Sequence, residues 1–269
     1  MKTKTKFISF VLMLGAVVTL HFPAFAQETE LMLLLDRVSE QLDSYPEYDS
    51  WKASVVSTTT KMDKNWQPKK VTIVKKILEI ANNEETEEVL QALETEKGKT
   101  KDVTEKYIKE AKKQREKAKK KERERKLKRK KENNERKVEL AWDDIFPFSE
   151  EKRINYNFIK LEDSYIDDLP VYVLESRAKI KNEKLWEGKY YIDKDSFNVL
   201  KVDLKPSKNP KFVKELEMEM SFQVIPQGYF VLKKSRMRIN GGIFIKRIRI
   251  TVEEEYSDYE IINSEEAGI

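Results

Sequence analysis

The chain has 269 residues, of which 38% are charged, and its formal net charge at pH 7 is only +5. It contains no cysteine, and its one histidine, His21, lies in an N-terminal segment that we expect to be removed. The mature chain therefore cannot use a Ser-His-Asp or Cys-His nucleophile, a zinc site of His or Cys ligands, or disulfide bonds. A glycosidase mechanism, which uses two carboxylates, remains compatible with this composition.

Residues 1–26 have the three parts of a secretory signal peptide. Three lysines at the start precede an apolar run over residues 7–22, and Ala24-Phe25-Ala26 supplies a small-x-small cleavage site. A transmembrane anchor is the alternative, but the run is short for a span and no basic stop-transfer cluster follows it. We therefore expect export to the periplasm with cleavage near Ala26, without a lipid anchor, because no cysteine follows that site.

The first part of the mature chain predicts one helix, two strands and a second helix. Apolar residues at helical spacing indicate an amphipathic helix over 29–44. Two runs, 51–62 and 66–80, favour strands joined by a turn at Asp63-Lys64-Asn65, although the second run also fits a helix. Asn82-Asn83 followed by acidic residues predicts a helix that ends near Gly98.

A basic segment follows and interrupts the body of the protein. Between Lys97 and Lys137 the chain has 21 Lys or Arg against 8 Asp or Glu, a net charge of +13. With few apolar residues, the segment over 98–137 is predicted to form a solvated, partly frayed helix. It is either a spacer or an arm that docks on an anionic membrane surface or an envelope protein; export argues against nucleic acid. Residues 138–148 are then expected to pack back onto the body through Trp142, Ile145, Phe146 and Phe148.

From residue 154 onward the sequence reads as a series of antiparallel strands. The predicted strands are 154–162, 169–180, 184–193, 198–204, 212–224, 229–240 and 243–259. Short connections, among them Ile166-Asp167-Asp168 and Asn240-Gly241-Gly242, require neighbouring strands to run antiparallel. With the two earlier strands the sheet reaches about nine, enough to curl into a partial barrel.

The strand over 212–224 has one apolar and one polar face. Its even positions are mostly apolar, whereas Glu215, Glu217 and Glu219 occupy the other face. Because strand side chains alternate with a period of two, this pattern predicts a large curved sheet with an apolar concave side. Solvated surface charge explains the glutamates better than a catalytic pair does, so we expect no enzyme activity.

Residues 185–193 (LWEGKYYID) are followed by Phe197-Asn198-Val199-Leu200, by 205–210 (KPSKNP), and later by Gly241-Gly242-Ile243-Phe244 ahead of 256–259 (YSDY). In this order the motifs resemble bacterial outer-membrane lipoprotein-sorting proteins, most closely over residues 154–262. The resemblance implies an α+β fold: a single domain over 27–269 that forms an unclosed antiparallel β half-barrel covered by helices. The basic helical insertion over 98–137 departs from that pattern.

The resemblance also implies a hydrophobic cavity that holds lipid acyl chains or lipoproteins in the periplasm for transfer toward the outer membrane. The candidate lining residues are Trp186, Tyr190, Leu216, Met218, Met220, Phe222, Phe244 and Ile248. The alternative is that these side chains fill a core against the N-terminal helix. An envelope sensor or scaffold that binds a protein partner through the basic arm is the competing function. No metal or cofactor is expected, and we expect a monomer.

Overall fold

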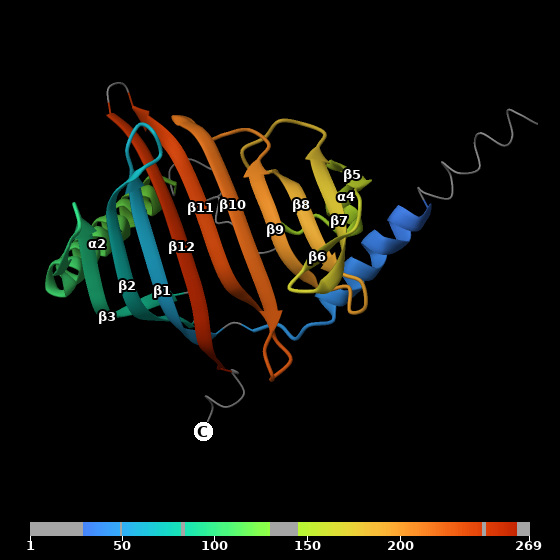
Figure 1. The fold of residues 1–269 in the computed structure, drawn as a ribbon, viewed down its shortest axis with the longest axis horizontal. Helices are drawn as coiled ribbons and strands as arrows, with labels where there is room; N and C mark the ends of the chain where they lie inside the picture. Colours follow the sequence, from blue (N-terminus) through green and yellow to red (C-terminus); the bar gives the residue numbers. More distant parts are fainter. Residues whose placement is uncertain (1–28, 49, 82–83, 130–144, 244–245, 263–269) are drawn as a thin grey trace, which may run out of the picture.

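The computed structural model describes residues 29–48, 50–81, 84–129, 145–243 and 246–262 (Figure 1). These residues form one antiparallel sheet of 12 strands in the order β4-β3-β2-β1-β12-β11-β10-β9-β8-β7-β5, with β6 paired to β7. The two ends of this order, β4 and β5, do not pair with each other, so the sheet is not closed. The predicted α+β class and unclosed antiparallel sheet are confirmed.

The strands are β1 (Trp51–Met62), β2 (Pro68–Ala81), β3 (Glu84–Glu96), β4 (Lys99–Asp102), β5 (Tyr156–Lys160), β6 (Ser164–Ile166), β7 (Leu169–Ala178), β8 (Trp186–Asp193), β9 (Val199–Pro206), β10 (Val213–Val224), β11 (Phe230–Ile243) and β12 (Lys246–Ile261). The helices are the N-terminal helix over residues 29–43, α2 (Thr104–Arg129) and the short α4 (Glu150–Arg153). The signal peptide, Trp142 and Phe244 lie outside the described residues.

The helix predicted to run to about Glu96 is wrong, because Glu84–Glu96 forms strand β3. It pairs with β2 from Lys70 opposite Glu96 to Ala81 opposite Glu84. Glu84 and Glu85, which favoured a helix start, lie opposite Ala81 and Ile80, and farther along the strand Glu94 pairs with Lys70. Cross-strand pairing overrides local helix propensity here. Lys97 and Gly98, both with positive φ, form the turn into β4.

The turn predicted at Asn240-Gly241-Gly242 is also wrong, because β11 continues through Ile243. Gly241 pairs with Val213 on one side and with Ile248 on the other. A Cβ at Gly241 would lie 2.9 Å from the backbone oxygen of Phe212. The glycine therefore serves a close approach between two strands rather than a reversal of the chain.

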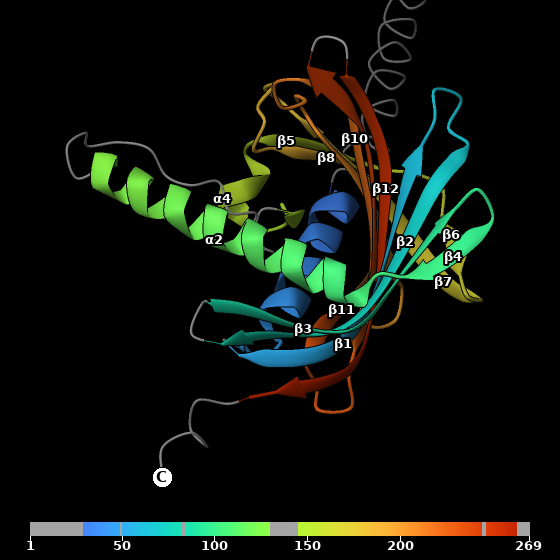
Figure 2. The same cartoon turned by 90° about the vertical axis from the view of Figure 1, so that its left-hand side faces the viewer.

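Both long helices lie on the same side of the bent sheet, which we call the inner face (Figure 2). The N-terminal helix packs on the part formed by β7–β11, whereas α2 leaves β4 and crosses the part that contains β3. Two backbone contacts set the start of α2: the Val103 N–H donates to the Ala92 carbonyl (2.8 Å), and the Ala92 N–H donates to Thr104 Oγ1 (2.9 Å). The predicted basic helical insertion is thus confirmed from Thr104 to Arg129, after the short unpredicted strand β4.

The main core lies between the N-terminal helix, residues 145–148 and strands β7–β11. Leu35 and Val38 of the helix are 1% and 0% exposed, and Ile145 and Phe148 are each 1% exposed. The predicted packing of residues 145, 146 and 148 back onto the body is confirmed. This half of the inner face is therefore filled by the protein's own side chains.

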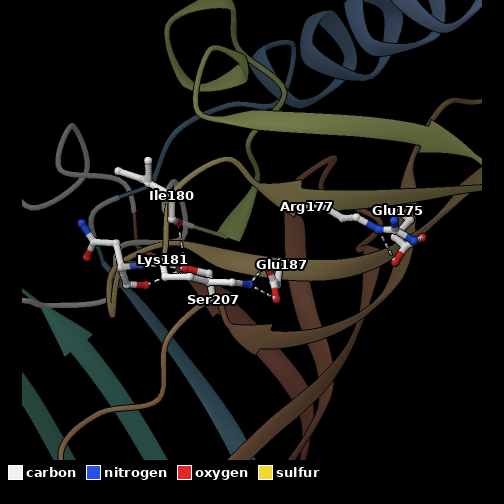
Figure 3. Close-up of polar contacts among 7 residues, drawn as sticks. Glu175, Arg177, Ile180, Lys181, Glu187 and Ser207 are labelled. Atoms are coloured by element: carbon white, nitrogen blue, oxygen red, sulfur yellow. Dashed lines mark hydrogen bonds and ion pairs between the residues drawn. The ribbon is translucent and has the colours of Figure 1, made fainter.

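The outer side of β7 and β8 carries polar contacts that fix the turn between them (Figure 3). Lys181 Nζ lies 3.1 Å from both carboxylate oxygens of Glu187. The buried Ser207 hydroxyl donates to the carbonyl oxygen of Asn182 (2.9 Å) and accepts from the Asn182 N–H (2.9 Å). These bonds tie the loop to the end of β9 and so fix the register of the neighbouring strands.

Candidate ligand-binding face

Strand β10 shows how the alternation of the sequence divides the two faces of the sheet. Met218, Met220 and Phe222 point to the inner face, where they belong to the buried core. The interleaved glutamates point outward: Glu217 lies 3.5 Å from Arg238, and Glu219 lies 3.9 Å from Arg236. These pairs are exposed ion pairs, which matches the predicted solvated role of the glutamates.

Five of the predicted cavity residues are buried among the protein's own side chains. Trp186, Tyr190, Met218, Met220 and Phe222 are 0–7% exposed and join the same core cluster. The Tyr190 hydroxyl donates to the Ile145 carbonyl at 2.9 Å, and the Tyr190 ring meets Phe148 edge-on at 4.9 Å between centroids. These five residues hold the N-terminal helix and residues 145–148 in place, and their role toward a ligand stays a prediction.

Beyond this core the inner face carries apolar side chains that are only partly covered. The strand register places Leu216 opposite Ile239, and Ile239 opposite Ile250. The next row places Met218 opposite Met237, and Met237 opposite Val252. We call the partly covered residues the apolar strip: Leu216, Met237, Ile239, Ile248, Ile250 and Val252.

The apolar strip is continuous with the core but is not filled by it. Leu216 and Met237 pack against the core cluster, whereas Ile239, Ile250 and Val252 are half-buried. Ile248 is 43% exposed and lies opposite Gly241. The strip therefore presents a row of apolar side chains across β10, β11 and β12.

Two of the predicted residues, Leu216 and Ile248, thus lie on the open part of the inner face. Sequence reasoning did not select Met237 and Ile239. The alternation of β11 is interrupted by a register shift near Phe222 and Leu232, which breaks the period-two signal along that strand. The strand register, which places Leu216 opposite Ile239 and Met218 opposite Met237, shows that Met237 and Ile239 lie on the inner face.

On β1, β2 and β3 the inner face carries a cluster of charged side chains. Under α2, Lys76 lies 3.7 Å from both Glu87 and Glu254, and Arg115 of α2 lies 3.4 Å from Glu87. The side chains of Lys76 and Glu87 are only 12% and 13% exposed. The same face of β1, β2 and β3 also carries Val55, Val74 and Ala92, which are 0–3% exposed, so charged and apolar side chains both lie on the part of the sheet that α2 covers.

Two tyrosines complete this charged cluster. The Tyr256 hydroxyl donates to Glu254 at 2.8 Å. Burial, followed by the charge of Glu254, raises the pKa of Tyr256 well above its usual value. Burial and the charges of Glu87 and Glu254 likewise raise the pKa of Tyr107 on α2. Both phenols stay protonated at neutral pH and are available as hydrogen-bond donors.

Within the described ranges, no group of three or more His, Cys, Asp or Glu side chains is arranged to hold a metal ion. Among the helices that the structure describes, none has the length and apolar character needed to cross a bilayer.

No protein-family model and no curated protein matches the sequence. Solved structures of similar fold include a putative outer membrane lipoprotein-sorting protein domain from Vibrio parahaemolyticus, with 12% identity and a TM-score of 0.37 over 87% of this chain and 95% of that one. A LolA superfamily protein from Nitrosomonas europaea shares 12% identity with a TM-score of 0.35, over 86% and 92% of the two chains.

A third structure, the MucA/MucB complex of Pseudomonas aeruginosa, matches with 8% identity and a TM-score of 0.26, over 87% of this chain and 100% of that one. The lipoprotein-sorting group that the sequence resembles is thus among the structures found. At these identities and TM-scores, no function passes from those proteins to this chain.

Proposed function

We propose that this protein is an exported binding protein that holds acyl chains, as free lipid or as part of a lipoprotein, against the inner face of its open sheet. The observation that carries this proposal is the apolar strip, which continues the core across β10–β12 but is only partly covered. Carriage of the bound chain through the periplasm toward the outer membrane belongs to the same proposal. Binding and release need no catalytic residue.

The size and chemistry of the strip suit an alkyl chain. Neighbouring strands lie about 4.8 Å apart, so three of them present a surface about 10 Å wide. Each methylene removed from water contributes about 0.8 kcal/mol, so about six buried methylenes contribute about 5 kcal/mol before ordering costs. Met237 supplies a flexible, polarizable side chain that adapts to chains of different shape.

The test introduces a charge on the inner face and compares it with the same charge on the outer face. Ile250→Glu places a carboxylate in the apolar strip. Val56→Glu is the matched control, because Val56 is 38% exposed and points away from its buried neighbour Val55. Titration of each protein with a fluorescent palmitate analogue gives the dissociation constants.

We expect wild type and Val56→Glu to bind alike and Ile250→Glu to bind at least about tenfold more weakly, a loss of about 1.4 kcal/mol. Circular dichroism spectra that match wild type show that each variant is folded. Absence of binding by the wild-type protein, or unchanged binding by Ile250→Glu, would overturn the proposal.

A second candidate function, engagement of an anionic membrane surface or an envelope protein through α2, is favoured by the charge of that helix. Residues 104–129 contain 14 Lys or Arg and 5 Asp or Glu. Lys109, Lys112, Lys113 and Lys117 are all exposed. Replacing these four lysines by glutamine should weaken salt-sensitive sedimentation with phosphatidylglycerol vesicles several-fold, since ten other Lys and Arg residues of α2 remain, and should leave palmitate binding unchanged. Unchanged sedimentation would exclude the membrane role, and a pull-down from envelope extract would then test a protein partner.

A further inference from the structure

A pair of lysines lies beside the apolar strip on the same face of the sheet. Ile250 of β12 is opposite Lys61 of β1, and Lys61 is in turn opposite Lys70 of β2. All three side chains point inward, because the alternation along β1 places Lys61 on the same side as the buried Val55. One row across the sheet thus runs from apolar side chains to two cations.

The two lysines differ in whether a nearby carboxylate neutralises their charge. Like charges directly opposite each other on one face destabilise a sheet unless an anion offsets them. Lys70 pairs with Glu94, and its hydrogen bond to that carboxylate lowers the pKa of Glu94. Among the described residues, no carboxylate lies within ion-pair distance of Lys61, whose side chain is exposed. Glu94 and Glu96 both lie beside Lys70 on the side away from Lys61, so Lys61 is the cation of this row that no described carboxylate reaches.

Hydroxyl groups adjoin this cation on the same face. Thr59 lies two residues before Lys61 on β1, opposite Val252 of β12 on one side and Thr72 of β2 on the other. A lysine ammonium offers three hydrogen-bond donors and a threonine hydroxyl offers one. An ammonium beside hydroxyl donors matches the oxygens of a phosphate group.

We propose that the ligand of the inner face is an anionic phospholipid, with its acyl chain on the apolar strip and its headgroup phosphate on Lys61. This inference rests on the proposed acyl-chain function and adds the ligand class. The chain covers Ile250 and its neighbours on β10–β12, and the headgroup lies over β1 and β2. A headgroup without a phosphate at the same position leaves Lys61 without an anionic partner, whereas Lys70 keeps Glu94.

The test compares two ligands that share one acyl chain, of which only the first carries a headgroup phosphate: lysophosphatidylglycerol and the corresponding monoacylglycerol. Both are titrated below their critical micelle concentrations by isothermal calorimetry, so that vesicle docking through α2 does not contribute. The variant is Lys61→Gln. The matched control is Lys75→Gln, because Lys75 is exposed on β2 opposite Val56 and faces outward.

We expect wild type and Lys75→Gln to bind the anionic lipid about tenfold more tightly than the neutral lipid, which has no phosphate. Lys61→Gln should bring the two dissociation constants within about twofold by weakening only the anionic lipid. Equal binding of both lipids by wild type, or a preference that survives in Lys61→Gln, would overturn this inference and leave the acyl-chain function intact. Failure of both lipids to bind would instead overturn the proposed function.

Discussion

Gly188 occupies a position in β8 where the backbone of β9 leaves no room for a side chain. Its φ is +153°, and a Cβ there would lie 2.0 Å from the backbone oxygen of Asp203. Gly188→Ala should therefore lower the free energy of unfolding by about 3 kcal/mol. Urea denaturation measures this, with Gly98→Ala as the control.

Gly98 also has a positive φ of +74°, but nothing lies within 4 Å of the added Cβ. Gly98→Ala should therefore lower the free energy of unfolding by only about 1 kcal/mol, which is the strain of a side chain in a left-handed turn. Equal costs for the two variants would show that β8 and β9 are not in the close contact described above.

Tyr190 links the sheet to residues 145–148 through a hydrogen bond that requires a protonated phenol. Burial raises its pKa well above the usual value of about 10, so the folded state holds this proton more tightly than the unfolded state. The contribution of Tyr190 to stability is therefore complete below about pH 10 and is lost as the pH rises beyond that value.

Tyr190→Phe should lower the free energy of unfolding by about 1 kcal/mol at pH 7, because the carbonyl of Ile145 loses its hydrogen-bond donor. The variant should also lose less stability than wild type between about pH 10 and pH 11. Tyr165→Phe is the control, because Tyr165 is 73% exposed. Parallel stability curves for wild type and Tyr190→Phe above pH 10 would contradict the buried, protonated phenol.

At the scale of elements, the N-terminal helix acts as a permanent core component that closes one half of the inner face. Leu35 is 1% exposed, whereas Leu33 on the same helix is 58% exposed. Leu35→Ala should lower the free energy of unfolding by about 3 kcal/mol, and Leu33→Ala should change it by less than about 0.5 kcal/mol. Chemical denaturation compares the two variants. A small effect of Leu35→Ala would mean that the helix is a detachable cover.

Helix α2, in contrast, reaches the sheet through an ion pair. Arg115 reaches Glu87 at 3.4 Å, next to Lys76. Arg115→Ala should increase hydrogen exchange of the amides over 104–117 by a few-fold, and added salt should do the same in wild type. The exposed Lys113→Ala serves as the control and should leave exchange unchanged. Equal exchange in all three proteins would show that Arg115 does not anchor the helix.

The strands most readily predicted from the sequence are those with uninterrupted alternation, because a period of two directly reports one buried face. The range 212–224 matches β10 almost to the residue, and the range 51–62 matches β1. Strand β3 was predicted as a helix because local propensity does not include its pairing with β2 or the ion pairs of Glu87 and Glu94 with Lys76 and Lys70. Short strands such as β4 and β6 carry too few residues for a periodic signal.

At the scale of the whole molecule, the site could be predicted only in part. Alternation identifies which residues face inward, and it correctly placed Leu216, Met218, Met220 and Phe222 on one face. It does not show where the N-terminal helix and residues 145–148 cover that face, since these contacts join positions far apart in the chain. The division between a filled core and an open apolar strip therefore emerges only from the three-dimensional packing.

The inner face combines three neighbouring regions: a filled core on β7–β11, the apolar strip on β10–β12, and a part on β1–β3 where charged side chains lie beside the buried Val55, Val74 and Ala92. An amphiphile fits the boundary between the second and third regions, because one end of such a molecule is apolar and the other is polar. This division of the face is the basis of the acyl-chain proposal.

The most direct test of that proposal maps where a bound chain lies. Wild-type protein is irradiated with a diazirine-labelled palmitate, and the labelled residues are identified by peptide mass spectrometry. We predict adducts on the inward-facing residues of β10, β11 and β12, above all Leu216, Ile239 and Ile250. Adducts confined to outward-facing residues such as Glu217 and Arg238, or spread evenly over both faces, would contradict the account.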